Sequence, residues 1–121
     1  MTELSLPNVS VASSGGEYFQ VSFEAKKDSE EMEDSEGAYF LIQRQFESPD
    51  GGRVYVESYE RVLCGHFRIK RAELHREVFR LELASRPASM AQIRFQADEK
   101  QYGRLKRVLQ IICPSGVLRI E

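Results

Sequence analysis

The stretch that decides the fold is residues 63–84, "LCGHFRIKRAELHREVFRLELA", because it is compatible with two different periods. Leu74, Val78 and Leu81 recur at intervals near 3.6, which is typical of an amphipathic helix. At both ends of the stretch, however, apolar and polar residues alternate strictly, in "LCGHFRIK" and again in "VFRLELA". The period of two is the cleaner one, so the sequence predicts strands at about 63–74 and 78–84, joined by a turn at 75–77.

The same alternation predicts three strands before this stretch. Residues 17–25 place Phe19, Val21 and Phe23 on one face. Residues 38–46, "AYFLIQRQF", begin with apolar side chains on both faces, which favours a central strand. The turn residues "SPDGG" then predict a hairpin that returns through 53–60, "RVYVESYE", with its two valines toward the core.

The two ends of the chain complete a sheet with one helix. "LSLPNVSVASSGG" predicts an edge strand interrupted by Pro7, and residues 91–97 predict a further strand. Residues 98–112 predict a helix, because Asp98 and Gln101 have the spacing of a capping box and an apolar stripe follows them. "VLRIE" allows a last edge strand. The predicted fold class is α+β: a twisted, mostly antiparallel β-sheet with one C-terminal α-helix packed on it.

Composition indicates a single domain over residues 1–121, because a chain of this length buries one core. "MTELSLPNVS" has neither the basic nor the apolar region of a secretory signal, and no apolar run is long enough for a membrane span. Two cysteines do not form a disulfide framework, so the sequence favours a reducing, cytoplasmic location.

Charge is unevenly distributed along the chain. Residues 28–36 carry six carboxylates and no Lys or Arg, whereas residues 37–121 carry 15 Lys and Arg against 10 Asp and Glu. The surrounding segment 26–37 is therefore predicted to be an acidic, flexible loop. A solvated loop is the ordinary interpretation of such a run, and a patch presented to a basic partner is the functional one.

Catalysis and metal binding are weakly supported by the sequence. Cys64 and His66 share one face of a predicted strand, but no Asn or Asp stands out to orient the imidazole. A zinc site would have to combine them with His75 and Cys113, and none of these residues has the spacing of a local ligand pair. We therefore expect no enzymatic activity, no metal and no cofactor.

Read as one pattern, residues 39–112 resemble a family of bacterial immunity proteins from polymorphic toxin systems, immunity protein 10. The resemblance is carried by Gln43–Arg44, Tyr55 with Glu57, Gly65, and Tyr102 with Leu105. It implies a non-catalytic inhibitor that neutralises a cognate toxin by binding it.

An inhibitor of this kind needs a rigid surface with aromatic anchors and charges complementary to its target. The partner-binding residues predicted on that basis are Glu30, Glu31, Glu33, Asp34, Glu36, Tyr55, Glu57 and Tyr59. The acidic segment would suit a toxin that is a nuclease with a basic groove. The alternative interpretation is a small nucleic-acid-binding module, since Tyr55 and Tyr59 lie near Arg53 and Arg61 in the sequence.

Overall fold

The structure is a computed structural model that describes residues 2–14, 18–25, 38–45, 53–58, 64–84, 89–114 and 116–121. These residues form nine strands and one helix. The strands are β1 (Thr2–Ser5), β2 (Asn8–Ser14), β3 (Tyr18–Glu24), β4 (Tyr39–Gln45), β5 (Val54–Ser58), β6 (Cys64–Leu74), β7 (Val78–Ala84), β8 (Ser89–Arg94) and β9 (Leu118–Ile120), and the helix is α1 (Glu99–Ile112).

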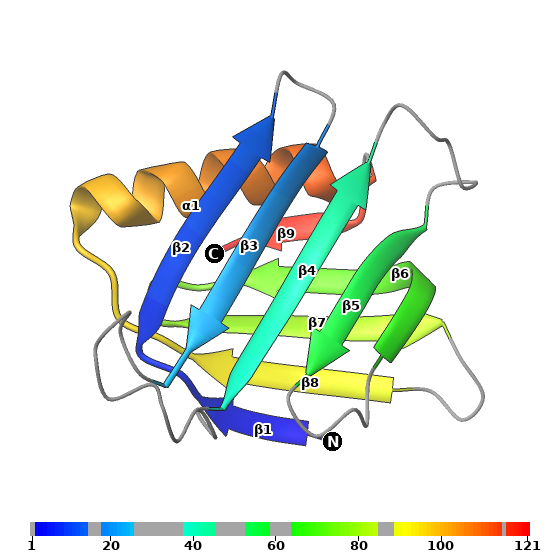
Figure 1. Cartoon of the computed structure of the whole chain (residues 1–121), viewed down its shortest axis with the longest axis horizontal. Coiled ribbons are helices and arrows are strands. Elements are labelled where there is room, and N and C mark those ends of the chain that lie inside the picture. Colours follow the sequence, from blue (N-terminus) through cyan, green and yellow to red (C-terminus); the bar gives the residue numbers. More distant parts are fainter. Residues whose placement is uncertain are drawn as a thin grey trace.

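The strands form one continuous sheet that is folded into two layers. The order in the sheet is β1-β8-β7-β6-β5-β4-β3-β2, with β9 paired to β6. We call β2 to β5 with residues 64–67 of β6 the front sheet, and β1, β8, β7, β9 with the rest of β6 the back sheet. The strands of the front sheet run diagonally across those of the back sheet (Figure 1).

Two bent segments join the layers at opposite corners, as expected where strands pass from one crossed sheet to the other. At one corner, Leu6 and Pro7 link β1 in the back sheet to β2 in the front sheet, and backbone bonds from Leu6 N to Arg94 O (2.8 Å) and from Gln96 N to Pro7 O (3.0 Å) hold the link. At the other corner, β6 pairs with β5 and then with β7, with a register shift between Ile69 and Arg71.

The core lies between the two sheets. Phe23 of β3 packs against Phe79 of β7 and Phe95, with ring centroids 6.0 and 5.6 Å apart, and all three rings are buried. Helix α1 contacts β2 and β3 and buries Leu105, Val108, Leu109 and Ile112 in the same cluster. The helix therefore seals the side of the two layers where β2 ends the front sheet (Figure 1).

The structure confirms the α+β fold and most of the predicted elements. Residues 71–84 are strand rather than helix, with a turn at 75–77 as predicted. The capping box is present: the Asp98 carboxylate accepts from Gln101 N at 2.7 Å, and Asp98 N donates to Gln101 Oε1 at 3.1 Å. The strand predicted at 91–97 instead covers residues 89–94. Phe95 follows the end of β8, where its N–H donates to Glu77 O at 3.0 Å and its ring is buried.

Two pairings are parallel, β1 with β8 and β6 with β9, so the sheet is mostly rather than wholly antiparallel. The acidic segment 26–37 and the "SPDGG" turn lie outside the described residues. The two residues that flank the acidic segment are hydrogen-bonded to each other, since Ala25 N donates to Ala38 O at 2.9 Å. The predicted segment therefore begins and ends at one point of the front sheet.

Candidate functional site

The outer face of the front sheet carries mainly tyrosine, glutamine and serine, with the Glu57 carboxylate among them. The register places Gln20, Gln43, Tyr55 and His66 in one row across four strands. A second row contains Ser22, Leu41, Glu57 and Cys64. Tyr18 and Tyr39 lie in the next rows on either side of these two, opposite Gln45 and Glu24. We call these ten side chains, the two rows with Tyr18 and Tyr39, the tyrosine face.

Glu57 connects two of the tyrosines. Its Oε1 accepts a hydrogen bond from the Tyr55 hydroxyl at 2.6 Å, and its Oε2 accepts one from the Tyr39 hydroxyl. All three side chains are partly exposed. Tyr39 belongs to β4, and Tyr55 and Glu57 belong to the adjacent strand β5. Because each tyrosine has only two side-chain torsions and a fixed partner, this cluster is ordered before anything binds to it.

A second cluster lies beside the first. The Tyr18 hydroxyl donates to Gln20 Oε1 and lies 3.4 Å from Gln43 Oε1, and Gln20 Nε2 donates to Ser22 Oγ at 3.0 Å. Gln43 is the cross-strand neighbour of Tyr55, so the two clusters adjoin. The face therefore presents several neutral hydrogen-bonding groups held in fixed positions by one another.

The environment of Tyr55 keeps its hydroxyl protonated. Its hydrogen bond to the Glu57 carboxylate raises the pKa of Tyr55, and its contact with Cys64 Sγ at 3.8 Å acts in the same direction. The Tyr55 ring also packs beside His66, with centroids 5.3 Å apart. Tyr55 is therefore a permanent hydrogen-bond donor at neutral pH.

The outer face of the back sheet has a different character. There Glu82 pairs with Lys70 at 3.6 Å and with Arg71 at 3.5 Å, and Glu73 pairs with Arg80 at 3.7 Å. Arg80 also donates to Gln92 Oε1 at 2.8 Å. Protein interfaces are depleted of charge at their centre and enriched in aromatic residues. By this criterion the tyrosine face is the candidate binding surface, and the back sheet is the solvated one.

The predicted site residues fall into two groups. Tyr55 and Glu57 lie together on the tyrosine face, as their spacing of two predicted. Tyr59 and the five acidic residues Glu30, Glu31, Glu33, Asp34 and Glu36 lie outside the described residues. Tyr18, Tyr39, Gln43 and His66 were not among the predicted site residues. Their alternation within each strand was visible, but the cross-strand register that brings them beside Tyr55 was not.

Cys64 and His66 are both exposed on this face, and their described contacts run to Tyr55 rather than to each other. A cysteine nucleophile requires a base within hydrogen-bonding reach of its sulfur. Cys64 instead has a neutral phenol beside it.

Burial raises the pKa of the Cys113 thiol to about 12, although the Arg44 guanidinium acts in the opposite direction. Arg44 also donates to Ile112 O at 3.0 Å and so satisfies a carbonyl at the end of α1.

We expect iodoacetamide to alkylate exposed Cys64 in the native chain and Cys113 only after unfolding, because the thiolate is the reactive species. Mass spectrometry of tryptic peptides measures both sites, with Cys64→Ser as the control. Equal labelling rates at the two sites would contradict the buried position of Cys113.

Among the described residues, no group of three or more His, Cys, Asp or Glu side chains is placed to hold a metal ion. No helix in the described part of the chain is long and apolar enough to cross a membrane. Comparison with protein-family models, with curated proteins and with solved structures finds no match for this chain.

Proposed function

We propose that this chain is an immunity protein that binds and neutralises a cognate bacterial toxin through the tyrosine face. The observation that carries the proposal is the internally hydrogen-bonded cluster of Tyr39 and Tyr55 around the Glu57 carboxylate on the front sheet. A preformed aromatic surface loses little conformational entropy on binding, which is what a tight inhibitor requires.

The residues that carry the resemblance to immunity protein 10 divide into two roles. Arg44 satisfies the end of α1, Leu105 is buried in the core, and Gly65 has φ of 142°, a conformation that favours glycine. Gln43, Tyr55 and Glu57 instead lie beside one another on the tyrosine face. The second group supports a binding role, because packing of the core does not require it.

The experiment that tests the proposal is a growth-rescue assay. The tagged chain captures proteins from a lysate of its native host, and each captured candidate is then expressed alone and together with the chain. We expect one candidate to arrest growth alone and to be neutralised by the wild-type chain. The Tyr39→Ala/Tyr55→Ala double variant should fail to neutralise it. If the double variant protects as well as the wild type, the tyrosine face is not the inhibitory surface.

Replacing Cys64 with serine and His66 with alanine is expected to leave protection of the cell within about threefold of the wild type. The two side chains belong to the tyrosine face at the β6 end of its rows, but Cys64 and His66 lack the mutual contact that catalysis needs. Growth rescue of each single variant and of the pair measures the effect. A complete loss of protection with an unchanged circular dichroism spectrum would instead support a small cysteine enzyme.

The acidic segment should set the speed of binding rather than the stability of the fold. We expect replacement of Glu30, Glu31, Glu33 and Asp34 by Gln or Ser to lower the association rate constant by about tenfold at low salt. The difference should shrink as salt rises, because the field of these carboxylates is screened beyond ~8–10 Å at physiological ionic strength. Stopped-flow fluorescence at several salt concentrations measures the rate.

Thermal stability should not change in that quadruple variant, since Ala25 and Ala38 are joined independently of the residues between them. Glu77→Gln/Glu99→Gln removes two exposed carboxylates elsewhere, and compared with Glu30→Gln/Glu31→Gln, which removes two from the segment, it separates the local field from net charge. If the quadruple variant associates at the wild-type rate in low salt, the segment is a linker only.

A nucleic-acid-binding module is the second candidate, and one observation favours it. The exposed side of α1 carries Lys100, Arg104, Lys106 and Arg107. Binding of single-stranded oligonucleotides with a steep dependence on salt, lost when these four residues are replaced by Gln, would support this function over toxin binding.

A further inference from the structure

The free edge of β2 forms one wall of a groove of about 730 Å³. The groove is lined by residues 7–10 at the start of β2, by Glu24, by residues 96–98 and by Gln101. β2 ends the strand order of the front sheet and has β3 as its partner, so its other edge meets no strand within the described part of the chain. The opposite wall is the first turn of α1, whose first half extends beyond that edge (Figure 1).

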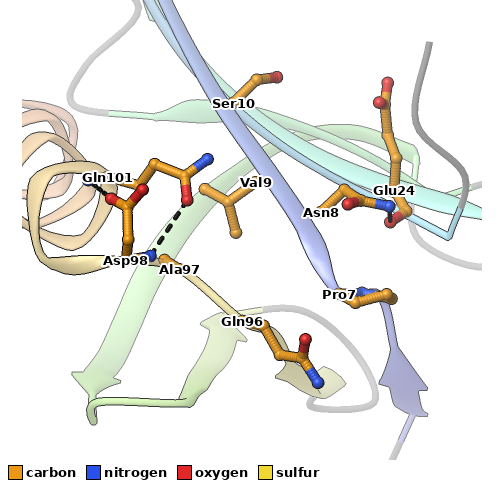
Figure 2. Close-up of a pocket in the computed structure, with 9 residues that line it drawn as sticks. All are labelled: Pro7, Asn8, Val9, Ser10, Glu24, Gln96, Ala97, Asp98 and Gln101. Atoms are coloured by element: carbon orange, nitrogen blue, oxygen red, sulfur yellow. Dashed lines mark hydrogen bonds between the residues drawn. The ribbon is translucent and has the colours of Figure 1, made fainter.

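Three polar side chains of the groove have hydrogen bonds within the chain: Asn8, Asp98 and Gln101. Asp98 and Gln101 bond reciprocally, and Figure 2 shows Val9 lying between β2 and this pair. On the other side of β2, Asn8 Nδ2 donates to Glu24 O and Ala25 O, at 3.3 Å each. The backbone of β2 at its free edge adds further hydrogen-bonding capacity to the groove. In an antiparallel pair, alternate residues of an edge strand direct their N–H and C=O groups away from the neighbouring strand.

β2 lacks four of the features that protect edge strands, which are short length, charge, a bulge and a proline within the strand. β1 and β9, which also have one described partner strand each, span four and three residues and carry the exposed charges Glu3 and Arg119. β2 spans seven residues, "NVSVASS", with no charge and no proline, in unbroken register with β3. An uncharged edge of this length is suited to pairing with another strand.

We propose that this groove is a peptide-binding site, in which an extended segment of a partner protein adds to β2 as a further strand and places a Lys or Arg side chain against the groove. The lining contains the carboxylates Glu24 and Asp98 and no Lys or Arg. Asp98 lies beside the free edge of β2, where a strand would add, and Glu24, the β3 partner of Asn8, lies on the other side of β2 (Figure 2). The site stands on its own residues and adds a second contact to the proposed function, beside the tyrosine face.

A second copy of the chain is the less suitable occupant. Its β2 would bring another Asp98 and Glu24, which repel those already present. It would also bring its own α1, which extends past the same edge (Figure 1). A single extended strand meets neither obstacle.

The test is a titration of the isotope-labelled full chain with a blocked peptide of about ten residues, in which Thr and Val alternate and two positions are Lys, a length suited to strand addition. Amide resonances of β2 and of residues 96–101 should shift, while those of the tyrosine face should not. Two matched peptides serve as controls: one has Glu in place of Lys, and one has Pro at alternate positions so that it cannot pair. Both should bind at least about tenfold more weakly.

A variant of the chain tests the charge. Asp98→Asn keeps a good N-cap, so Glu24→Gln/Asp98→Asn should fold normally and weaken the Lys peptide by about tenfold. Equal binding of the three peptides, or shifts outside β2 and the groove, would overturn the proposal. Protection of the β2 amides from exchange in the free chain, together with a dimer in sedimentation, would assign the edge to a second copy and overturn it also. Because the probe is not the toxin, a failed growth rescue leaves this result unaffected.

Discussion

Alanine at both Tyr39 and Tyr55 is expected to weaken binding of the partner toxin by at least about a hundredfold, because buried tyrosines at interface centres each contribute about 2 kcal/mol or more. The double change removes two rings and both hydroxyls that bond to Glu57. In the complex, the Glu57 carboxylate would then be desolvated without its partners, which adds to the loss. Isothermal titration calorimetry with the purified toxin domain measures the affinity.

Two sets of variants identify the cause of that loss. Tyr39→Phe and Tyr55→Phe keep the rings and remove the hydroxyls, so each should cost less than the corresponding alanine. Glu73→Ala/Arg80→Ala on the back sheet removes a described ion pair of 3.7 Å and should leave affinity unchanged. If the back-sheet pair reduces affinity as strongly as the tyrosine pair, the partner covers the opposite side of the molecule.

Replacing Phe23 with alanine is expected to lower the free energy of unfolding by about 3–5 kcal/mol. Phe23 is fully buried and lies within 6.5 Å of three other rings, those of Phe40, Phe79 and Phe95. These rings come from both layers, so the cavity left by the change would lie at the contact between the two sheets. Since domains are stabilised by about 5–15 kcal/mol in total, this loss is a large fraction of the stability.

Urea denaturation followed by tyrosine fluorescence measures this effect. Phe19→Ala is the matched control, because Phe19 is on the same strand and face but is only partly buried. Its loss should be clearly smaller. A Phe23→Ala variant that loses less than about 1 kcal/mol would mean that the two layers are not joined through this cluster.

The local patterns of the sequence predicted strands and helix well, because each is encoded by neighbouring residues. The alternation of Phe79, Leu81 and Leu83 with charged residues distinguished strand from helix, and Asp98 with Gln101 defined the start of α1. The bend in β6 is also visible in the sequence of that strand. Side chains at even positions are exposed through Lys70, and Arg71 is exposed too, after which the inward positions are Ala72 and Leu74. Two consecutive charged residues that reverse the alternation indicate a bulge.

Pairing between distant segments was not predictable in the same way. An alternating strand specifies which of its faces is buried but not which strand lies beside it. Thr2 opposite Ala91 and Ala72 opposite Leu118 are therefore features that only the whole fold defines. The same limit applied to the site: Tyr55 and Glu57 follow from spacing, whereas Tyr39 and Gln43 join them through cross-strand register.

The pairing of β1 with β8 has a consequence for synthesis on the ribosome. β1 is translated before its partner, and the strand it pairs with follows about 90 residues later, roughly 5–20 s at ordinary elongation rates. During that interval Leu6, which is fully buried in the finished protein, has no back sheet to cover it. The nascent chain therefore exposes Leu6 until β8 has been translated, and chaperones that bind apolar side chains could hold it in that interval.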